Sequence, residues 1–469
     1  MASKRDQLHA YQFLVQRTVS ALVTRETDPE QPPFRRPGNA AFGGLALAVI
    51  ALAAVGVYGI LVPGGNDSWR DGKSVVVEKE TGTRYVYLDE RLHPVANYTS
   101  ALLAIDSSAK TVTVSRNSLM GVPRGPRIGI PDAPDALPGK GQLMSGGWTM
   151  CSQPLADPTG TMVPRSVLMV AQQPATGERL GANAVLLTAG EETFLVHNGY
   201  RHRIAPGDLT TVSVALRPTP ALRVSPAVVE ALPVGLPLRP IPVPGAGKPS
   251  SAIAGRPDLR AGQLFVTTTS RGVQHYLVEP ARLRPITELQ YDIQRAFAPT
   301  AAAYPGSKPV GLPLDLLDAG SARMATVAAP RAADPPSERP EFTYGADDAT
   351  VCLTFSRHRF VPTVTMEPAM PEIDPMTATP RRTTGGTALA DRVSVPAGHA
   401  VVVESMPSED APRGTLMVVT DMGMSYPLAD QKVLEVLGYA GIEPVRMPAG
   451  LVARIPMGSG LSHEAAMRR

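Results

Sequence analysis

The sequence predicts an α+β protein. It has a cytoplasmic N-terminal helix, one transmembrane helix, and an elongated extracytoplasmic region of four small β-hairpin/helix repeats around a split, mainly β central domain. Three observations predict this class: one long uncharged apolar run, four segments with the same local pattern, and 48 Pro among 469 residues. That Pro content is about twice the usual share. Because Pro removes backbone donors, it argues for small modules on Pro-rich connectors rather than one large domain.

Composition excludes several classes of protein. The 45 Lys and Arg nearly balance the 42 Asp and Glu, so the net charge is only +3, whereas nucleic-acid-binding chains carry a clustered basic excess. Two Cys are too few for a disulfide-rich miniprotein or for a four-cysteine zinc site, and the 8 His form no H-E-x-x-H pattern. We therefore expect no nucleic acid, no metal and no cofactor.

The apolar run FGGLALAVIALAAVGVYGILV begins at Phe42 and ends at Val62. At 1.5 Å per residue, an uncharged helix of this length spans about 30 Å, the hydrocarbon thickness of a bilayer. A cleaved signal peptide is the alternative, but 41 residues precede the run and it is too long for a signal peptide. The six Lys and Arg before the run place the N-terminus in the cytoplasm. The prediction is a single-pass plasma-membrane protein whose later residues are extracytoplasmic.

The segment before the anchor has the pattern of a helix. Ser3 and Asp6 form an S-x-x-D cap, and one apolar stripe follows at helical spacing: Leu8, Tyr11, Val15, Val19 and Leu22. A free helix this short is marginal in water. Two interpretations follow: the helix lies on the membrane surface, or it docks to a cytoplasmic partner.

Four later segments share a pattern of apolar strand, glycine turn and ring-bearing strand, usually followed by a helical stretch. The glycines are Gly82, Gly199, Gly272 and Gly423, and three residues after them stand Tyr85, His202, His275 and Tyr426. Positive φ at such turns suits hairpins. In the third segment Leu283, Ile286, Leu289 and Ile293 follow at helical spacing. A duplicated strand–turn–strand–helix unit is favoured over four independent hairpins, because a lone hairpin is unstable in water.

Unequal spacing between the repeats indicates two inserts, and each insert holds one cysteine, Cys151 or Cys352. Outside the cytoplasm a disulfide is permitted, and closing so long a loop is worth on the order of 5 kcal/mol in the chain-entropy model. The bond would staple both inserts into one central domain; two free thiols is the alternative. A segment with nine prolines, 218–249, is predicted to be an extended, stiff spacer.

These features divide the chain into nine segments. The N-terminal helix and linker take residues 1–41 and the membrane helix takes 42–62. Repeat 1 takes 67–120, the first half of the central domain 121–184, and repeat 2 with its Pro-rich connector 185–245. Repeat 3 takes 255–322, the second half of the central domain 323–405, repeat 4 406–460 and the C-terminal tail 461–469.

Patterns of catalytic chemistry are incomplete. Gly72-Lys73-Ser74 ends like a phosphate-binding loop, but Asp67 stands where the first glycine belongs, and a strand follows instead of a helix. There is no G-x-S-x-G. His197 and His202 straddle a turn without further metal ligands, and the acid pairs Asp347-Asp348 and Glu191-Glu192 lie in loop-like contexts. We expect no catalytic residue.

The chain resembles a known family along nearly its whole length. The matching segments are SKRDQLHAYQFLVQRTVSALV from Ser3, RRPGNAAFGGLALAVIALAAVGVYG from Arg35, NDSWRDGKSVVVEKETGTRYVYLDERLHPVANYTSALL from Asn66, GIPDAPDALP, GGWTMC and the late MGMSYPLAD. They resemble EccB, a core membrane component of the type VII (ESX) secretion system of actinobacteria.

The resemblance implies assembly with EccC, EccD and EccE in a hexameric membrane complex, contact between copies of the chain, and contact with a mycosin protease. It assigns the staple to Cys151 and Cys352. It assigns cytoplasmic docking to Arg5, Asp6, Gln7, Tyr11 and Phe13.

The sequence thus predicts a non-catalytic structural subunit that anchors and organises the extracytoplasmic side of a secretion complex. Two alternatives remain. One is an extracytoplasmic ATPase or hydrolase. The other is a cell-wall-binding module that holds glycan on rings such as Tyr85 and Tyr426.

Overall fold

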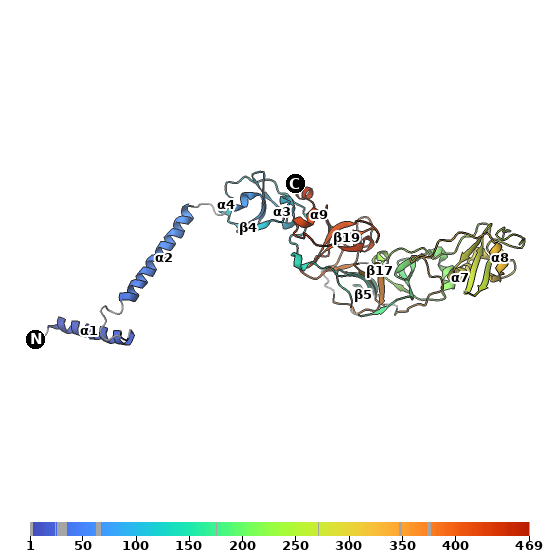
Figure 1. Cartoon of the computed structure of the whole chain (residues 1–469), viewed down its shortest axis with the longest axis horizontal. Helices are drawn as coiled ribbons and strands as arrows, with labels where there is room; N and C mark the ends of the chain where they lie inside the picture. The colour runs from blue at the N-terminus through green and yellow to red at the C-terminus, as the bar shows by residue number, and fades with distance from the viewer. Residues whose placement is uncertain are drawn as a thin grey trace.

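The computed structural model is an extended molecule in which two separate helices precede a row of β-rich units (Figure 1). It describes residues 3–23, 25, 35–61, 67–174, 176–270, 272–346, 349–357, 359–372 and 377–468. The described elements therefore include the membrane helix and all five sheets.

Helix α1 (Lys4–Val23) begins with the predicted cap, because Ser3 N–H donates to Asp6 Oδ2 at 3.0 Å and Asp6 N–H donates to Ser3 Oγ at 3.4 Å. Helix α2 (Arg35–Leu61) contains an apolar span, Gly38–Tyr58, with a mean hydropathy of 2.4 and no burial against the protein. Phe42 lies within this span and is exposed. Val62, the predicted end of the anchor, lies outside the described residues.

Four small sheets share one topology: three antiparallel strands, a helix or helical turn, and a fourth strand parallel to the first. Repeat 1 contains β1 (Ser74–Glu78), β2 (Arg84–Leu88), β3 (Arg91–Pro94), α3 (Tyr98–Ile105) and β4 (Lys110–Val114). Repeat 2 contains β8 (Ala184–Ala189), β9 (Glu192–His197), β10 (Tyr200–Ile204), α5 (Leu209–Leu216) and β11 (Ala221–Arg223).

Repeats 3 and 4 follow the same plan. Repeat 3 contains β12 (Leu264–Thr269), β13 (Gly272–Val278), β14 (Leu283–Ile286), α7 (Glu288–Ala296) and β15 (Gly311–Pro313). Repeat 4 contains β19 (Ala400–Met406), β20 (Thr415–Thr420), β21 (Ser425–Pro427), α9 (Gln431–Val436) and β22 (Val445–Pro448). Its first strand therefore lies before residue 406, where the sequence placed the start of this repeat.

A short helix follows each fourth strand: α4 (Arg116–Leu119), α6 (Pro226–Ala231), α8 (Leu316–Ser321) and α10 (Ala449–Val452). The chain then runs beside the third strand of the same repeat. Parallel bridges mark this closing step: Leu92 with Arg124, Arg201 with Val234, Leu283 with Met324, and Ser425 with Met457. Each unit is thus longer and more closed than the predicted hairpin and helix.

The predicted equivalence of the four turn glycines is wrong. Gly82 lies between the first and second strands of its repeat and Gly272 is the first residue of its second strand, whereas Gly199 and Gly423 lie between the second and third strands. All four have positive φ, from 69° to 117°. Because each repeat contains two consecutive hairpins, one local pattern matched different turns. Likewise Leu283 and Ile286, predicted on a helix with Leu289 and Ile293, lie on strand β14.

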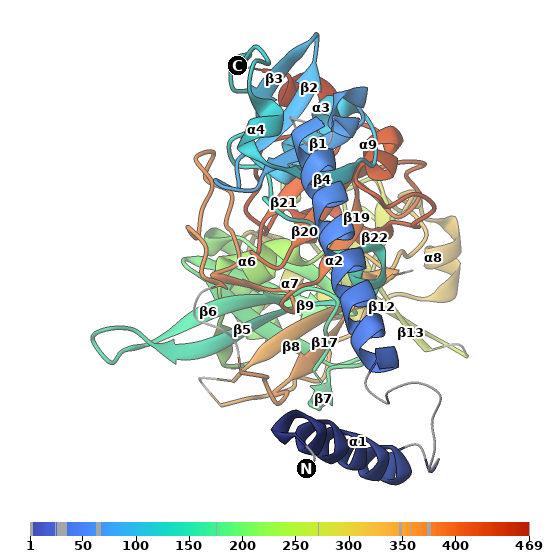
Figure 2. The same cartoon turned by 90° about the vertical axis from the view of Figure 1, so that its left-hand side faces the viewer.

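The central domain is one six-stranded sheet in the order β18-β6-β5-β16-β17-β7. Its strands come from before repeat 2 and from after repeat 3: β5 (Trp148–Ala156), β6 (Met162–Met169), β7 (Glu178–Arg179), β16 (Val351–Ser356), β17 (Arg359–Met366) and β18 (Arg392–Ser394). The β5–β6 hairpin projects from the side of the row (Figure 2). The predicted split domain is therefore a single sheet in space.

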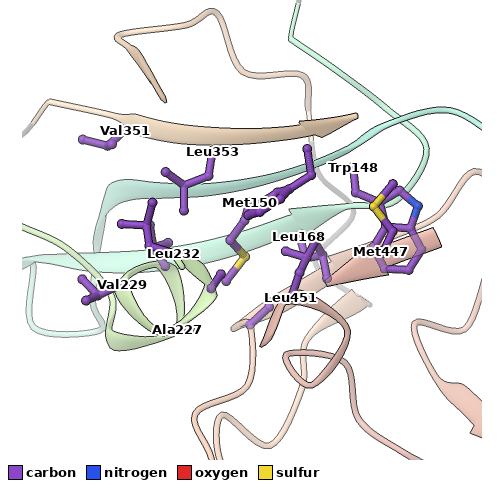
Figure 3. Close-up of a cluster of buried hydrophobic side chains, with 14 of the residues drawn as sticks. Trp148, Met150, Leu168, Ala227, Val229, Leu232, Val351, Leu353, Met447 and Leu451 are labelled. Atoms are coloured by element: carbon purple, nitrogen blue, oxygen red, sulfur yellow. The ribbon is translucent and has the colours of Figure 1, made fainter. Parts of the chain in front are cut away.

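The units follow one another in space in the order repeat 1, repeat 4, central domain, repeat 2, repeat 3 (Figure 1). Trp148, Met150 and Leu168 of the central sheet pack with residues of both flanking repeats, among them Ala227, Val229, Leu232, Met447 and Leu451 (Figure 3). The chain therefore runs outward to repeat 3 and returns through repeat 4 to lie beside repeat 1.

The middle repeats have sheets that are buried on both faces. In β8, Val185 and Leu187 face the central core while Ala184 and Leu186 face the core shared with repeat 3. Strand β19 repeats this alternation: Val401 and Val403 join the central core, and Ala400 and Val402 join the core shared with repeat 1. Burial on both faces explains the unbroken apolar runs AVLL and AVVV.

Candidate functional site: the docking and assembly surfaces

Helix α1 carries the predicted docking residues on an exposed surface. Tyr11 and Phe13 are 68% and 60% exposed, and Arg5, Asp6 and Gln7 of the first turns are also exposed. Residues two apart on a helix point in nearly opposite directions, so Tyr11 and Phe13 lie on different faces. The apolar surface of α1 is therefore wider than the single stripe that the sequence predicts, which suits contact on two sides.

A disulfide joins Cys151 to Cys352, the two cysteines of the chain. They lie directly opposite each other on antiparallel strands β5 and β16, and both are fully buried. Since β5 belongs to the outgoing chain and β16 to the returning chain, this bond fixes the two arms to each other at the centre of the row.

A buried hydrogen-bond network lies next to the disulfide. Ser166 Oγ donates to Asp391 Oδ2 at 2.7 Å, and the Ser166 N–H donates to the same oxygen at 2.8 Å. Ser225 Oγ lies 3.0 Å from Ser166 Oγ, and the Ser225 N–H donates to Ser152 Oγ at 3.0 Å. Because Ser225 precedes α6, the network joins repeat 2 to both halves of the central domain. Satisfied polar networks of this kind favour one arrangement of the parts they join.

Repeat 1 and repeat 4 share a core and polar contacts. Helices α3, α9 and α11 (His463–Ala466) pack together, and Lys432 forms an ion pair with Asp106. Tyr439 Oη donates to the Pro138 carbonyl at 2.8 Å, and His463 Nδ1 lies 2.8 Å from the Leu103 carbonyl. The last elements of the chain therefore complete the unit nearest the membrane helix.

Repeat 2 and repeat 3 are joined in the equivalent way, through α5 and α7. Val212 and Leu216 pack on Leu289 and Ile293 in one core. The side chain of Gln294 accepts from the Ile241 N–H at 2.8 Å and donates to its carbonyl at 3.0 Å. Ile241 belongs to the segment predicted as an extended spacer, so part of that segment packs against the joint.

A ring packs on a glycine in three of the four repeats, and the sequence reasoning missed this contact. An added Cβ would lie 2.2 Å from His93 at Gly125, 2.5 Å from His202 at Gly235 and 2.5 Å from Tyr426 at Gly458. The signal was present as a P-x-G motif at 123–125, 233–235 and 456–458. In repeat 3 the corresponding residues are Arg284 and Ala325.

His202 serves this packing rather than metal binding. Its Nδ1 lies 2.8 Å from the Leu236 carbonyl, and burial of the ring lowers the pKa of His202 below its ordinary value. His197 pairs with Tyr200 across the hairpin and not with His202. Within the described part of the chain, no group of three His, Cys, Asp or Glu side chains is placed to hold a metal ion.

In the segment that resembles the end of a phosphate-binding loop, Asp71 occupies the hydrogen-bond donors. Asp71 ends η1 (Ser68–Asp71), and its carboxylate accepts from the Lys73 N–H at 2.8 Å and from Ser74 Oγ at 3.4 Å. In a phosphate-binding loop such donors face the phosphate. Here a negative charge uses them, and it would repel a phosphate.

The rings considered for glycan binding are not exposed. Tyr85 is 8% and Tyr426 6% exposed. Tyr85 Oη donates to Glu78 Oε2 at 3.3 Å, and the Arg124 guanidinium lies 4.4 Å from the Tyr85 ring centroid. Both rings therefore serve packing inside their repeats.

One apolar helix, an exposed helix before it and a closed row of repeats after it define a class: single-pass membrane proteins with an extended repeat region outside the membrane. The chain belongs to the EccB family of type VII secretion, because the family described as Type VII secretion system ESX-1, transport TM domain B, matches residues 1–469. This membership and the single span fit an extracytoplasmic C-terminal region.

Two relatives from Mycobacterium tuberculosis illustrate the similarity. The ESX-1 secretion system ATPase EccB1 is 34% identical over 283 residues, which cover 58% of this chain and 57% of that protein. The match thus spans little more than half of that relative. The ESX-2 secretion system ATPase EccB2 is 27% identical over 497 residues, covering 99% of this chain and 94% of that protein.

Solved structures share the fold. A chain of the intact ESX-5 inner membrane complex has a TM-score of 0.60 and 24% identity, with 100% of this chain and 95% of that chain covered. The EccB3 dimer from the ESX-3 core complex has a TM-score of 0.59 and 22% identity, with 84% and 100% covered. The predicted fold class, α+β with an N-terminal apolar helix and a β-rich outer region, is confirmed.

Proposed function

We propose that this chain is a non-catalytic structural subunit of the type VII secretion membrane complex, which anchors and organises the extracytoplasmic side for protein export. One observation carries the proposal: a single membrane helix connects an exposed docking helix to a row of units that pack into one another. Such an arrangement fixes the extracytoplasmic units relative to the cytoplasmic partner that α1 binds.

The partners follow from family membership. Helix α1 docks to cytoplasmic parts of EccC and EccD, EccE joins the same complex, and copies of this chain contact one another in a hexameric assembly. A mycosin protease contacts the extracytoplasmic region. The similar solved structures are those of an inner membrane complex and of a dimer, which supports assembly as the common role.

The test uses the full chain, tagged and extracted in mild detergent with its complex. Replacing both Tyr11 and Phe13 with Ala removes the large side chains from two faces of α1 and should strongly reduce recovery of EccC and EccD. Gln16→Ala, an exposed change on the same helix, should leave recovery unchanged. Equal recovery with all three chains, or a wild-type chain that runs as a lone monomer, would overturn the proposal.

The names of the relatives raise a second candidate, an ATPase. The Asp71 carboxylate at the Gly72-Lys73-Ser74 turn counts against hydrolysis there. The purified chain should hydrolyse no ATP above background, measured by phosphate release. Hydrolysis that Lys73→Ala abolishes would establish the enzymatic alternative.

A further inference from the structure

The short helix after the fourth strand has a partner in the two middle repeats. Helices α6 and α10 contact each other beneath the central sheet. Ala227 of α6 is 1% exposed, and a Cβ added at Gly450 of α10 would lie 3.6 Å from the Glu230 carbonyl oxygen. An ion pair between Arg454 and Glu230 crosses the same contact.

The parallel bridges establish which residues of the other repeats correspond to these. Ala227 precedes its bridging residue Val234 by seven positions, and Gly450 precedes Met457 by the same number. Counting back equally from Met324 and Arg124 gives Leu317 in repeat 3 and Asn117 in repeat 1. The contact position of the middle repeats is therefore apolar in repeat 3 and polar in repeat 1.

Leu317 is the most exposed large apolar side chain of the described residues, at 83%, and its neighbour Leu316 is 65% exposed. Two adjacent leucines that face water leave apolar surface hydrated, so burying them against a partner is favourable. The rest of α8 is integrated normally, because Ala319 is buried and Asp318 bonds Arg256 at 2.6 Å. The exposure is therefore a property of this face and not of a poorly packed helix.

The position of α8 limits what can cover it. Repeat 3 is the end of the row farthest from α2 (Figure 1). Copies anchored by the same helix in the same membrane carry α8 at the same height. A two-fold axis normal to the membrane would bring α8 of one copy onto α8 of another, as an isologous contact.

We infer that the Leu316–Leu317 face of α8 is a self-association surface, which joins repeat 3 of one copy to repeat 3 of a second copy of this chain. The contact reproduces between molecules the helix-to-helix packing that α6 and α10 make within one molecule. This inference rests on the proposed assembly role and adds the surface through which two copies meet.

Cross-linking of the full chain in detergent micelles tests the contact. Leu317→Cys should form a disulfide-linked dimer under mild oxidation, read on a non-reducing gel. The matched control is Met422→Cys, also highly exposed, at 79%, but in repeat 4. The native cysteines are buried and bonded, so they do not compete. We expect dimer yield at least about tenfold higher with Leu317→Cys.

A second variant tests the energetics. Leu317→Asn installs the residue that repeat 1 carries at this position and should weaken self-association about tenfold or more, measured by sedimentation. Met422→Asn should not. Dimer yield no higher than that of Met422→Cys, cross-linking to a chain of different mass, or unchanged association of Leu317→Asn would overturn the inference. If the chain still recovers EccC through α1 in these cases, the proposed function stands.

Discussion

At the residue scale, two kinds of contact stand out: the disulfide between Cys151 and Cys352, and the packing of a ring on a glycine in three of the repeats. The disulfide could be predicted because the chain has two cysteines and a location outside the cytoplasm favours disulfide formation. The four rings that follow the turn glycines were wrongly predicted to occupy equivalent positions in their repeats. Tyr85 and His275 lie on second strands, whereas His202 and Tyr426 lie on third strands. A glycine followed by a ring is a local pattern, and the contact that distinguishes the third strand comes from a glycine about thirty residues later.

The ring-on-glycine contact predicts that Gly235→Ala destabilises the protein. The added Cβ would lie 2.5 Å from the buried His202 ring, so either the ring or the closing segment must shift, at about 1–3 kcal/mol. Thermal unfolding of the full chain in detergent should show a lower midpoint. Gly207→Ala is the control, since a Cβ there meets nothing within 4 Å. Equal midpoints for the two variants would refute the steric argument.

At the element scale, the long features were predictable and the short ones were not. The membrane helix and the apolar first strands give strong signals over many residues. Strands β11 and β15 have three residues each, too few to show a period. Their place comes from parallel pairing with the first strand, which is a tertiary contact. Leu283 and Ile286 were predicted on a helix because they are three residues apart and precede Leu289. They lie on strand β14, and the helix begins only at Glu288.

The joint between repeats 2 and 3 predicts a local effect of Ile293→Ala. Ile293 is fully buried in the core that α5 and α7 share, so the truncation leaves a cavity costing about 2–5 kcal/mol. Hydrogen exchange should show faster opening of α5 and α7 while the core between repeats 1 and 4 keeps its protection. The exposed Val273→Ala in the same repeat serves as control. Uniformly faster exchange throughout the row would show that the joints are not separable.

At the scale of the whole molecule, the sequence predicted the units and the split central domain but not their order in space. Nothing local shows that repeat 4 lies between repeat 1 and the central sheet. That order is set by the sheets that are apolar on both faces, because each of them packs between two neighbouring units, as β8 and β19 do. The candidate docking residues of α1 remain a prediction, because their partners lie outside this chain.

The disulfide predicts a large effect on global stability. Replacing both Cys151 and Cys352 with Ala releases a loop with a sequence separation of 201 residues, which the chain-entropy model values at about 5 kcal/mol. The unfolding midpoint in urea should fall clearly, and a reductant should lower the wild-type midpoint but not that of the variant. Two titratable thiols in the native wild-type protein would contradict the bond.

The out-and-back path of the chain also sets the order of its maturation. During translocation the membrane-proximal repeat 1 emerges first, yet its residues Val75, Val86 and Leu103 share a core with residues of repeat 4 and α11, in addition to the nearby Ile128 and Ile130. Repeat 1 must wait, with part of its apolar face open, until residues 400–466 have crossed the bilayer. A prematurely terminated chain would therefore display that face beside the membrane, where a protease or chaperone could recognise it. The core between repeat 1 and repeat 4 can therefore be completed only after repeat 4 and α11 have been synthesised.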